Sequence, residues 1–267
     1  MKYSRILVFV LFVALLVPAF AASATELTAR GKPGDDLVIK KKPVPPPPEP
    51  TEGGAPLTGQ RYALIIGISD YEGDSSDLTY ADDDAIDWFN YFDALGYTIT
   101  LLIDGQATKA NILAGFQWLA DMEDEAGDSV VIAYSGHGYY SRTSGESCLI
   151  SWELAGVWTS EIKAITDTFQ SQHVFFFDDA CNQGTMANLV GAGWVAAIGS
   201  TTKTYTYDGS ADMANGIFTY YAIHEAIDIY GYSTAEAISQ YAVDAFDAAT
   251  RGDATLYDSY TIGDMTF

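Results

Sequence analysis

The chain has 267 residues, 48% of them hydrophobic, and a formal net charge of −23. So acidic a protein repels nucleic acid and anionic membranes, so we expect neither as a partner. The charge would suit cationic peptides or calcium, and a surface that is simply soluble in high salt is an equally good interpretation.

The N-terminus has the order typical of a secretory signal. Lys2 and Arg5 precede the apolar stretch Ile6–Phe20, which ends in four small residues at 21–24. The stretch is short for a membrane span, which needs about 20 apolar residues. Residues 1–24 are therefore predicted to be a signal peptide, and the mature protein to be secreted or otherwise extracytoplasmic, without membrane contact. If the segment is not removed, it would serve as a membrane anchor instead.

Residues 25–60 are predicted to be a proline-rich disordered linker. Lys40-Lys41-Lys42 precedes the tract Pro43-Val44-Pro45-Pro46-Pro47-Pro48-Glu49-Pro50. Such a tract is extended and stiff and cannot build a core. The remaining residues, 61–267, are an appropriate length for one domain with a full core.

Strand and helix patterns alternate from residue 61 onward. Short apolar or β-branched runs predict strands at 62–68, 98–103, 130–134, 174–177 and 194–198. Longer amphipathic segments predict helices at 82–95, 108–122, 159–169, about 216–228 and about 233–248. Residues 139–158 are rich in Gly, Ser and Thr and are expected to be irregular. The alternation predicts an α/β fold with a mostly parallel central sheet and helices on both faces.

Two of the predicted strands end in residues that can do chemistry. The run 130–134 is followed by Ser135-Gly136-His137-Gly138, and the run 174–177 leads into Asp178-Asp179-Ala180-Cys181. Sites in open α/β sheets lie just beyond the carboxyl ends of the strands. If the two strands are neighbours, an imidazole would lie beside a thiol, the pair needed for cysteine nucleophilic catalysis.

Each of these residues also has a structural interpretation. The two cysteines, Cys148 and Cys181, could form a disulfide, as cysteines of exported proteins often do. His137 could be a loop residue held in a turn by its flanking glycines. Of the other histidines, His173 is expected at the surface or as a cap, and His224 as a structural residue of a helix.

Two other kinds of site find little support. The spacing of the histidines and cysteines matches no compact zinc-ligand pattern. An α/β hydrolase would need a Gly-x-Ser-x-Gly elbow, and the sequence contains none.

Four segments together resemble a known family. They are Tyr62-Ala63-Leu64-Ile65-Ile66-Gly67-Ile68, Leu78-Thr79-Tyr80-Ala81-Asp82-Asp83-Asp84-Ala85, Tyr134-Ser135-Gly136-His137-Gly138 and Asp178-Asp179-Ala180-Cys181. In this order they resemble the caspase-like cysteine peptidases of clan CD (C14-like), in particular the metacaspase and prokaryotic caspase-homologue branch. The likeness is clear from residue 61 to about 202 and weakens afterwards. It implies a caspase-like peptidase domain over 61–267, built as a three-layer αβα sandwich.

The resemblance implies roles for specific residues. Cys181 would attack the peptide carbonyl and His137 would protonate the leaving amine, while the N–H groups of Gly138 and Cys181 would form the oxyanion hole. Caspases carry Gln two residues before the cysteine, whereas this chain has Asp179 there, as metacaspases do. Asp84 matches a second acidic position of the substrate pocket, although a first-turn helix charge is an alternative for it.

These carboxylates determine the expected substrate. A buried carboxylate pair needs a cation to offset desolvation, and an Arg or Lys side chain supplies one. We therefore expect an exported cysteine endopeptidase that cleaves peptides and proteins after Arg or Lys. The alternative is a catalytically silent caspase-like module that binds peptides or partner proteins. No cofactor is required; the resemblance raises activation by calcium, although no EF-hand loop is visible.

Overall fold

The computed structural model describes residues 57–182, 186–200, 205–250 and 252–267. The predicted signal peptide, and the predicted linker up to residue 56, lie outside the described residues. Within the described ranges, no helix combines the length and the apolar character needed to cross a membrane.

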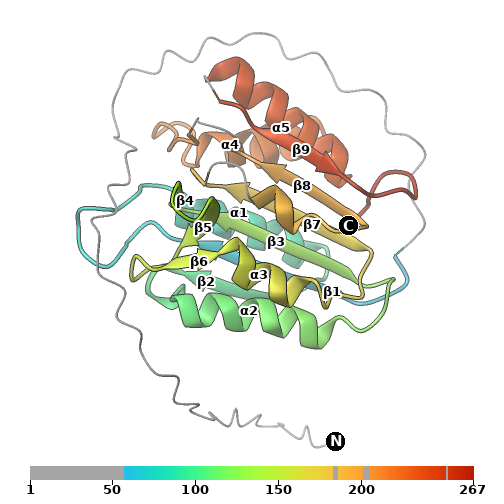
Figure 1. Ribbon diagram of the computed structural model, residues 1–267. Coiled ribbons are helices and arrows are strands. Elements are labelled where there is room, and N and C mark those ends of the chain that lie inside the picture. The colour runs from blue at the N-terminus through green and yellow to red at the C-terminus, as the bar shows by residue number, and fades with distance from the viewer. Residues whose placement is uncertain (1–56, 183–185, 201–204, 251) are drawn as a thin grey trace, which may run out of the picture.

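A six-stranded sheet forms the centre of the molecule, in the order β2-β1-β3-β7-β8-β9 (Figure 1). The strands are β1 (Arg61–Gly67), β2 (Thr98–Ile103), β3 (Ser129–Ser135), β7 (His173–Asp179), β8 (Trp194–Ile198) and β9 (Thr255–Asp258). All pairings are parallel except that of β9 with β8. The five predicted strands are confirmed, and β9 is an additional edge strand that no strand pattern had indicated.

Helices cover both faces of this sheet, which confirms the three-layer αβα architecture (Figure 1). They are α1 (Ala81–Ala94), α2 (Lys109–Met122), α3 (Thr159–Thr166), α4 (Ile217–Tyr220), the π-helix η3 (Tyr221–Ile229) and α5 (Ala235–Ala249), with short 3₁₀ turns η1 (Asp104–Gln106) and η2 (Met186–Leu189). Successive residues of a strand face opposite sides. Phe177 accordingly packs in the core under α1, α4, η3 and α5, and Phe176 in the core under α2 and α3.

The segment expected to be irregular forms a second, antiparallel sheet of three strands. These are β4 (Gly138–Ser141), β5 (Glu146–Ile150) and β6 (Gly156–Trp158), in the order β4-β5-β6. The expectation was wrong because two short hairpins carry many Gly, Ser and Thr residues, which hides the strand pattern. Cys148 and Leu149 of β5 are nevertheless fully buried.

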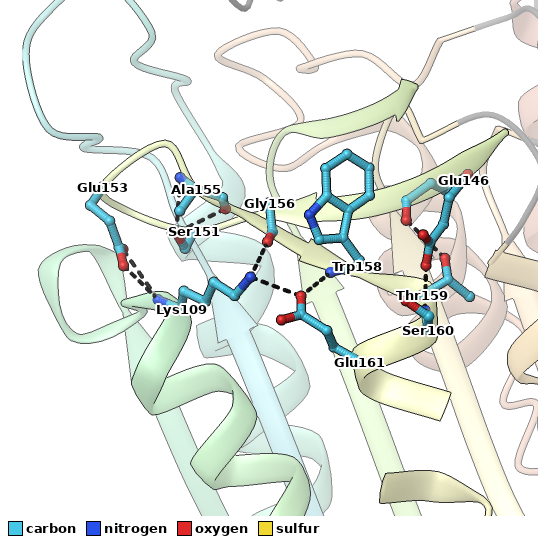
Figure 2. Close-up of polar contacts among 11 residues, drawn as sticks. Lys109, Glu146, Ser151, Glu153, Ala155, Gly156, Trp158, Thr159, Ser160 and Glu161 are labelled. Carbon is cyan, nitrogen blue, oxygen red and sulfur yellow. Dashed lines mark hydrogen bonds and ion pairs between the residues drawn. The ribbon is translucent and has the colours of Figure 1, made fainter. Parts of the chain in front are cut away.

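A polar network joins the small sheet to two helices (Figure 2). Lys109 Nζ, at the start of α2, donates to the Gly156 carbonyl and pairs with the Glu161 carboxylate, both at 2.8 Å. The Glu153 carboxylate accepts from the Lys109 main-chain N–H at 3.0 Å, and Glu161 also accepts from the Trp158 N–H at 3.0 Å. The network therefore fixes the sheet that begins directly after His137.

Candidate active site

The two chemistry-bearing segments follow neighbouring strands that pair in parallel. Ser135, the last residue of β3, lies opposite Asp179, the last residue of β7. The Gly136 N–H continues the ladder by donating to the Asp179 carbonyl at 3.3 Å. His137 and Cys181 therefore each lie two residues beyond the same rung, at the same edge of the sheet.

Gly138 lies directly against the segment that contains Cys181. A Cβ on Gly138 would lie 2.8 Å from the Asn182 nitrogen and 2.9 Å from the Cys181 carbonyl carbon. Because real Cβ atoms do not approach backbone so closely, this position accepts only glycine. The glycine beside His137 thus permits the close approach of the histidine and cysteine loops.

The main chain and ring of His137 are both held by residues before α1. Its N–H donates to the Tyr71 hydroxyl at 2.7 Å, and its Nε2 lies 2.7 Å from the Ser76 carbonyl oxygen. A carbonyl can only accept, so Nε2 carries the hydrogen and Nδ1 keeps its lone pair. Burial lowers the pKa of His137, against the opposing effects of the Ser76 carbonyl and the Asp208 charge. A neutral imidazole at neutral pH can act as a base.

Cys181 carries a free, half-buried thiol. The thiol donates to the Thr206 carbonyl at 3.5 Å and lies 3.7 Å from the Thr206 hydroxyl. Burial raises the pKa of Cys181 to about 11; the hydrogen-bond contacts with Thr206 oppose the rise, and the Asp179 and Asp178 charges add to it. The thiol is therefore protonated at neutral pH in this conformation and needs a base to become a nucleophile.

The second cysteine is not linked to the first. Cys148 is buried in β5 and is also a free thiol, so the alternative of a Cys148–Cys181 disulfide is wrong for this structure. Burial raises the pKa of Cys148 to about 12, which makes it an inert core residue.

Asp84 is completely buried at the start of α1. Its carboxylate accepts from the Ser135 hydroxyl at 2.6 Å, from Asn215 Nδ2 at 3.0 Å and from the Gly216 N–H at 2.9 Å. Burial raises the pKa of Asp84 well above its usual range, and the Asp179 charge raises it further. Asp84 does lie in the first turn of α1, as the helix-charge alternative requires, but its carboxylate is buried rather than solvated.

Asp179 faces Asp84 across Gly216. A Cβ on Gly216 would lie 2.6 Å from Asp179 Oδ2 and 2.7 Å from Asp84 Oδ2. The Thr219 N–H and hydroxyl both donate to Asp179 Oδ2, at 3.1 and 3.0 Å. Burial raises the pKa of Asp179 to about 6, although these donors oppose the rise. We call Asp84 and Asp179 the acidic pair; both carboxylates are buried, and the Asp179 charge raises the pKa of Asp84.

The remaining histidines lie elsewhere. His173 is buried at the start of β7, where its Nδ1 lies 2.9 Å from the Tyr260 hydroxyl, so the expected surface position was wrong. His224 lies in η3 and contacts Asp87 and Asp228 at 3.5 and 3.4 Å. Among the residues that the structure describes, no group of three or more His, Cys, Asp or Glu side chains could hold a metal ion.

Several residues of this site had not been singled out from the sequence. They are Tyr71, Ser135, Thr206, Asp208, Asn215, Gly216 and Thr219. Ser135 is part of the histidine motif, so its position was a usable signal, although no role had been assigned to it. Tyr71, Thr206, Asp208 and Asn215 lie in connecting segments without a motif, and Gly216 and Thr219 lie at the start of α4. Only the folded chain brings them to the strand ends.

Comparisons with known proteins agree with this architecture. The family model described as "Caspase domain" (Peptidase_C14) matches residues 60–246. Among solved structures, the chain is similar to the crystal structure of protein GSU0716 from Geobacter sulfurreducens, with a TM-score of 0.63 and 16% identity. That alignment covers 76% of this chain and 94% of the other, and at this identity it supports the fold alone. No curated protein matches the chain.

The family model spans most of the folded domain, whose central sheet is mostly parallel and is covered by helices on both faces (Figure 1). The chain belongs to the caspase-domain family of cysteine-type peptidases.

Proposed function

We propose that this chain is an exported cysteine endopeptidase that uses His137 and Cys181 to cleave peptide bonds after Arg or Lys. Within the family, the motifs around these residues favour the metacaspase-like branch. The observation that carries the specificity is the acidic pair, because Asp84 and Asp179 converge on Gly216 at the edge of the sheet where Cys181 lies.

The proposed reaction begins at the thiol. Nδ1 of His137 takes the proton of Cys181 as Sγ attacks the scissile carbonyl carbon. The oxygen of the tetrahedral intermediate accepts from the N–H groups of Gly138 and Cys181. The imidazolium then protonates the leaving amine, and water, deprotonated by His137, hydrolyses the thioester.

The acidic pair supports a basic side chain before the cut bond. Buried carboxylates without a cation carry a desolvation cost, which the raised pKa values of both residues reflect. A guanidinium or ammonium group entering between them would offset that cost and restore the ionised form. An Asp side chain would add a third negative charge and be rejected.

One observation favours the second candidate, a catalytically silent module that binds basic peptides. The Cys181 thiol donates to the Thr206 carbonyl at 3.5 Å, and burial raises the pKa of the thiol to about 11, so in this conformation the thiol is protonated and bonded to Thr206. Activity requires the thiol to exchange this hydrogen bond for one to His137 when substrate enters. A silent module would instead bind the peptide and leave the thiol bonded to Thr206.

The test is hydrolysis of fluorogenic peptides that end in Arg, Lys or Asp, with and without calcium. We expect turnover of the Arg and Lys peptides, loss of turnover in Cys181→Ala, and retention in the matched variant Cys148→Ala. Binding of the Arg peptide without turnover under any condition would establish the silent module instead. The calcium arm decides whether the ion activates the enzyme.

Export is tested separately. Intact-mass analysis of protein recovered outside the producing cells should give a chain that begins close to residue 25. A chain that retains residues 1–24 in the membrane fraction would establish an anchor instead of a signal peptide.

A further inference from the structure

Asp178 is a buried carboxyl group for which the proposed reaction has no use. It lies one residue before Asp179 on β7, so its side chain faces the opposite side of the sheet. Asp178 is 0% exposed. Asn182, the residue after Cys181, donates from Nδ2 to Asp178 Oδ2 at 2.7 Å.

Each of these two side chains has an oxygen without a partner. Among the described residues, Asp178 Oδ1 and Asn182 Oδ1 are buried and have no hydrogen-bond partner. A buried acceptor without a partner has lost its hydrogen bonds to water without replacement, which destabilises the fold. A carboxyl and a carboxamide are planar groups of the same shape, and the Nδ2–Oδ2 bond already joins one atom of each. A hydrogen bond between the two remaining oxygens would require a proton on one of them, because both are acceptors.

We propose that Asp178 is a neutral carboxylic acid that forms a closed acid–amide pair with Asn182, with Asp178 Oδ1–H donating to Asn182 Oδ1, and that this pair positions the backbone after Cys181. Both orphaned oxygens are then satisfied. Burial raises the pKa of Asp178 to about 8, so the group keeps its proton at neutral pH. The hydrogen bond from the Asn182 side-chain amide opposes the rise, and the Asp179 charge adds to it.

Three groups would then hold Asn182 in place: Asp178 at its side chain, Ser147 at its carbonyl and Gly138 beside its nitrogen. The Asn182 carbonyl accepts from the Ser147 hydroxyl of β5, and the Asn182 nitrogen lies against Gly138. With the side chain fixed to Asp178, the residue after the nucleophile has little freedom. This role rests on the proposed function, in which Cys181 attacks and its N–H helps to bind the oxyanion.

The neutrality of Asp178 matters because the acid–amide pair lies close to the Cys181 thiol and the oxyanion, both of which become negative during the proposed reaction. The titratable groups that bear on Asp178 are Asp179 and Cys181 from its own segment and Tyr134 from β3. A negative Asp178 would raise the pKa of Cys181 further and oppose both the thiolate and the oxyanion. An acid–amide pair supplies the anchor without that charge.

Exchange of the two groups tests the pairing. Asp178→Asn leaves two amides that can form the same two hydrogen bonds, so we expect kcat for an Arg peptide to fall less than about threefold. Asn182→Asp places two carboxyl groups together, so kcat at pH 8 should fall at least about tenfold and recover partly at pH 6. The double exchange Asp178→Asn/Asn182→Asp rebuilds the pair in reverse and should restore most of the loss.

A second readout needs no peptidase activity. Between the unfolded pKa of about 3.9 and the folded pKa of about 8, the folded protein holds a proton that the unfolded chain has released, so stability falls as the pH rises. Asp178→Asn removes this contribution. The Tm of the wild type relative to Asp178→Asn should therefore decrease between pH 5 and pH 8, while the exposed control Asp93→Asn should show no such trend.

The outcomes separate the two proposals. If no peptide is cut and yet the trend in Tm is present, the acid–amide pair stands and both the proposed function and the positioning role fail. If the Tm difference between wild type and Asp178→Asn is constant with pH, the neutral acid is overturned. Loss of kcat in Asp178→Asn as large as that in Asn182→Asp would overturn it as well.

Discussion

Asp178 and Asp179 are adjacent, both buried, and surrounded in opposite ways. Asp179 receives hydrogen bonds from the Thr219 N–H and hydroxyl and faces Asp84, and its pKa is about 6. Asp178 receives one bond from the Asn182 amide, and its pKa is about 8. Burial raises both pKa values, and the additional donors to Asp179 offset more of that rise, so Asp179 is expected to ionise first. Two identical side chains at one strand end thus acquire different tasks: Asp179 is suited to bind a cation and Asp178 to remain neutral.

The largest expected effect follows from removal of the charge of either member of the acidic pair. Asp84→Asn or Asp179→Asn should lower kcat/KM for an Arg peptide at least about a hundredfold, because a desolvated charge pair loses one partner. Asp178→Asn makes the same chemical change one residue away and should cost far less. Steady-state kinetics on Arg and citrulline peptides measures this, since citrulline has the shape of Arg without its charge.

An equal loss of kcat/KM for the citrulline peptide and the Arg peptide in these variants would contradict this distinction between the two carboxyl groups. The acidic pair would then hold the fold of the site together rather than recognise charge. Loss of kcat/KM in Asp178→Asn equal to that in Asp179→Asn would likewise remove the distinction between the two carboxyl groups.

Substitution of Gly216 gives a second test of the acidic pair, by steric hindrance instead of loss of charge. Its φ of −57° is open to alanine, but a Cβ would lie 2.6 and 2.7 Å from the two carboxylates. Gly216→Ala should therefore raise KM for Arg peptides about tenfold or more, with a smaller effect on kcat. An unchanged KM would show that the substrate side chain does not enter between Asp84 and Asp179.

The strand ends of the site could be predicted from the sequence, whereas the residues that pack against them from other segments could not. The apolar runs before His137 and Cys181 indicated two parallel strands, and the motifs placed Asp84 and Asp179 near them. Thr206 and Asn215 lie in a connecting segment after β8 with no pattern to mark them, and tertiary structure alone brings them to Cys181 and Asp84. The Asp178–Asn182 contact was equally invisible, because a polar residue at a strand end is unremarkable until its burial is known.

The acidic pair also predicts a pH dependence of substrate binding. As the pH rises through the pKa of Asp179, about 6, the carboxylate ionises and gains affinity for a cation. KM for an Arg peptide should therefore fall between pH 5 and pH 7, by at most about tenfold per pH unit for each group that titrates. KM for the citrulline peptide should change little, and the same steep fall with citrulline would contradict the assignment to charge.

The smallest expected effect concerns Thr206, whose side chain contacts both the Cys181 thiol and the Asp179 carboxylate. Its hydrogen bonds lower the pKa of Cys181 and of Asp179. Thr206→Val removes the hydroxyl and should shift the pH dependence of KM upward by a few tenths of a pH unit, with a change in kcat of about threefold or less. A downward shift would mean that the hydroxyl does not stabilise the carboxylate.

Covalent labelling tests the central claim most directly. A peptidyl chloromethyl ketone that ends in Arg should add one equivalent, located on Cys181 by mass spectrometry, while Cys181→Ala and the Asp84→Asn/Asp179→Asn variant should remain unlabelled under the same conditions. The account predicts no adduct from the corresponding reagent that ends in Asp. Labelling of Cys148, or equal labelling of Cys181 by both reagents, would contradict a cysteine nucleophile served by an acidic pair.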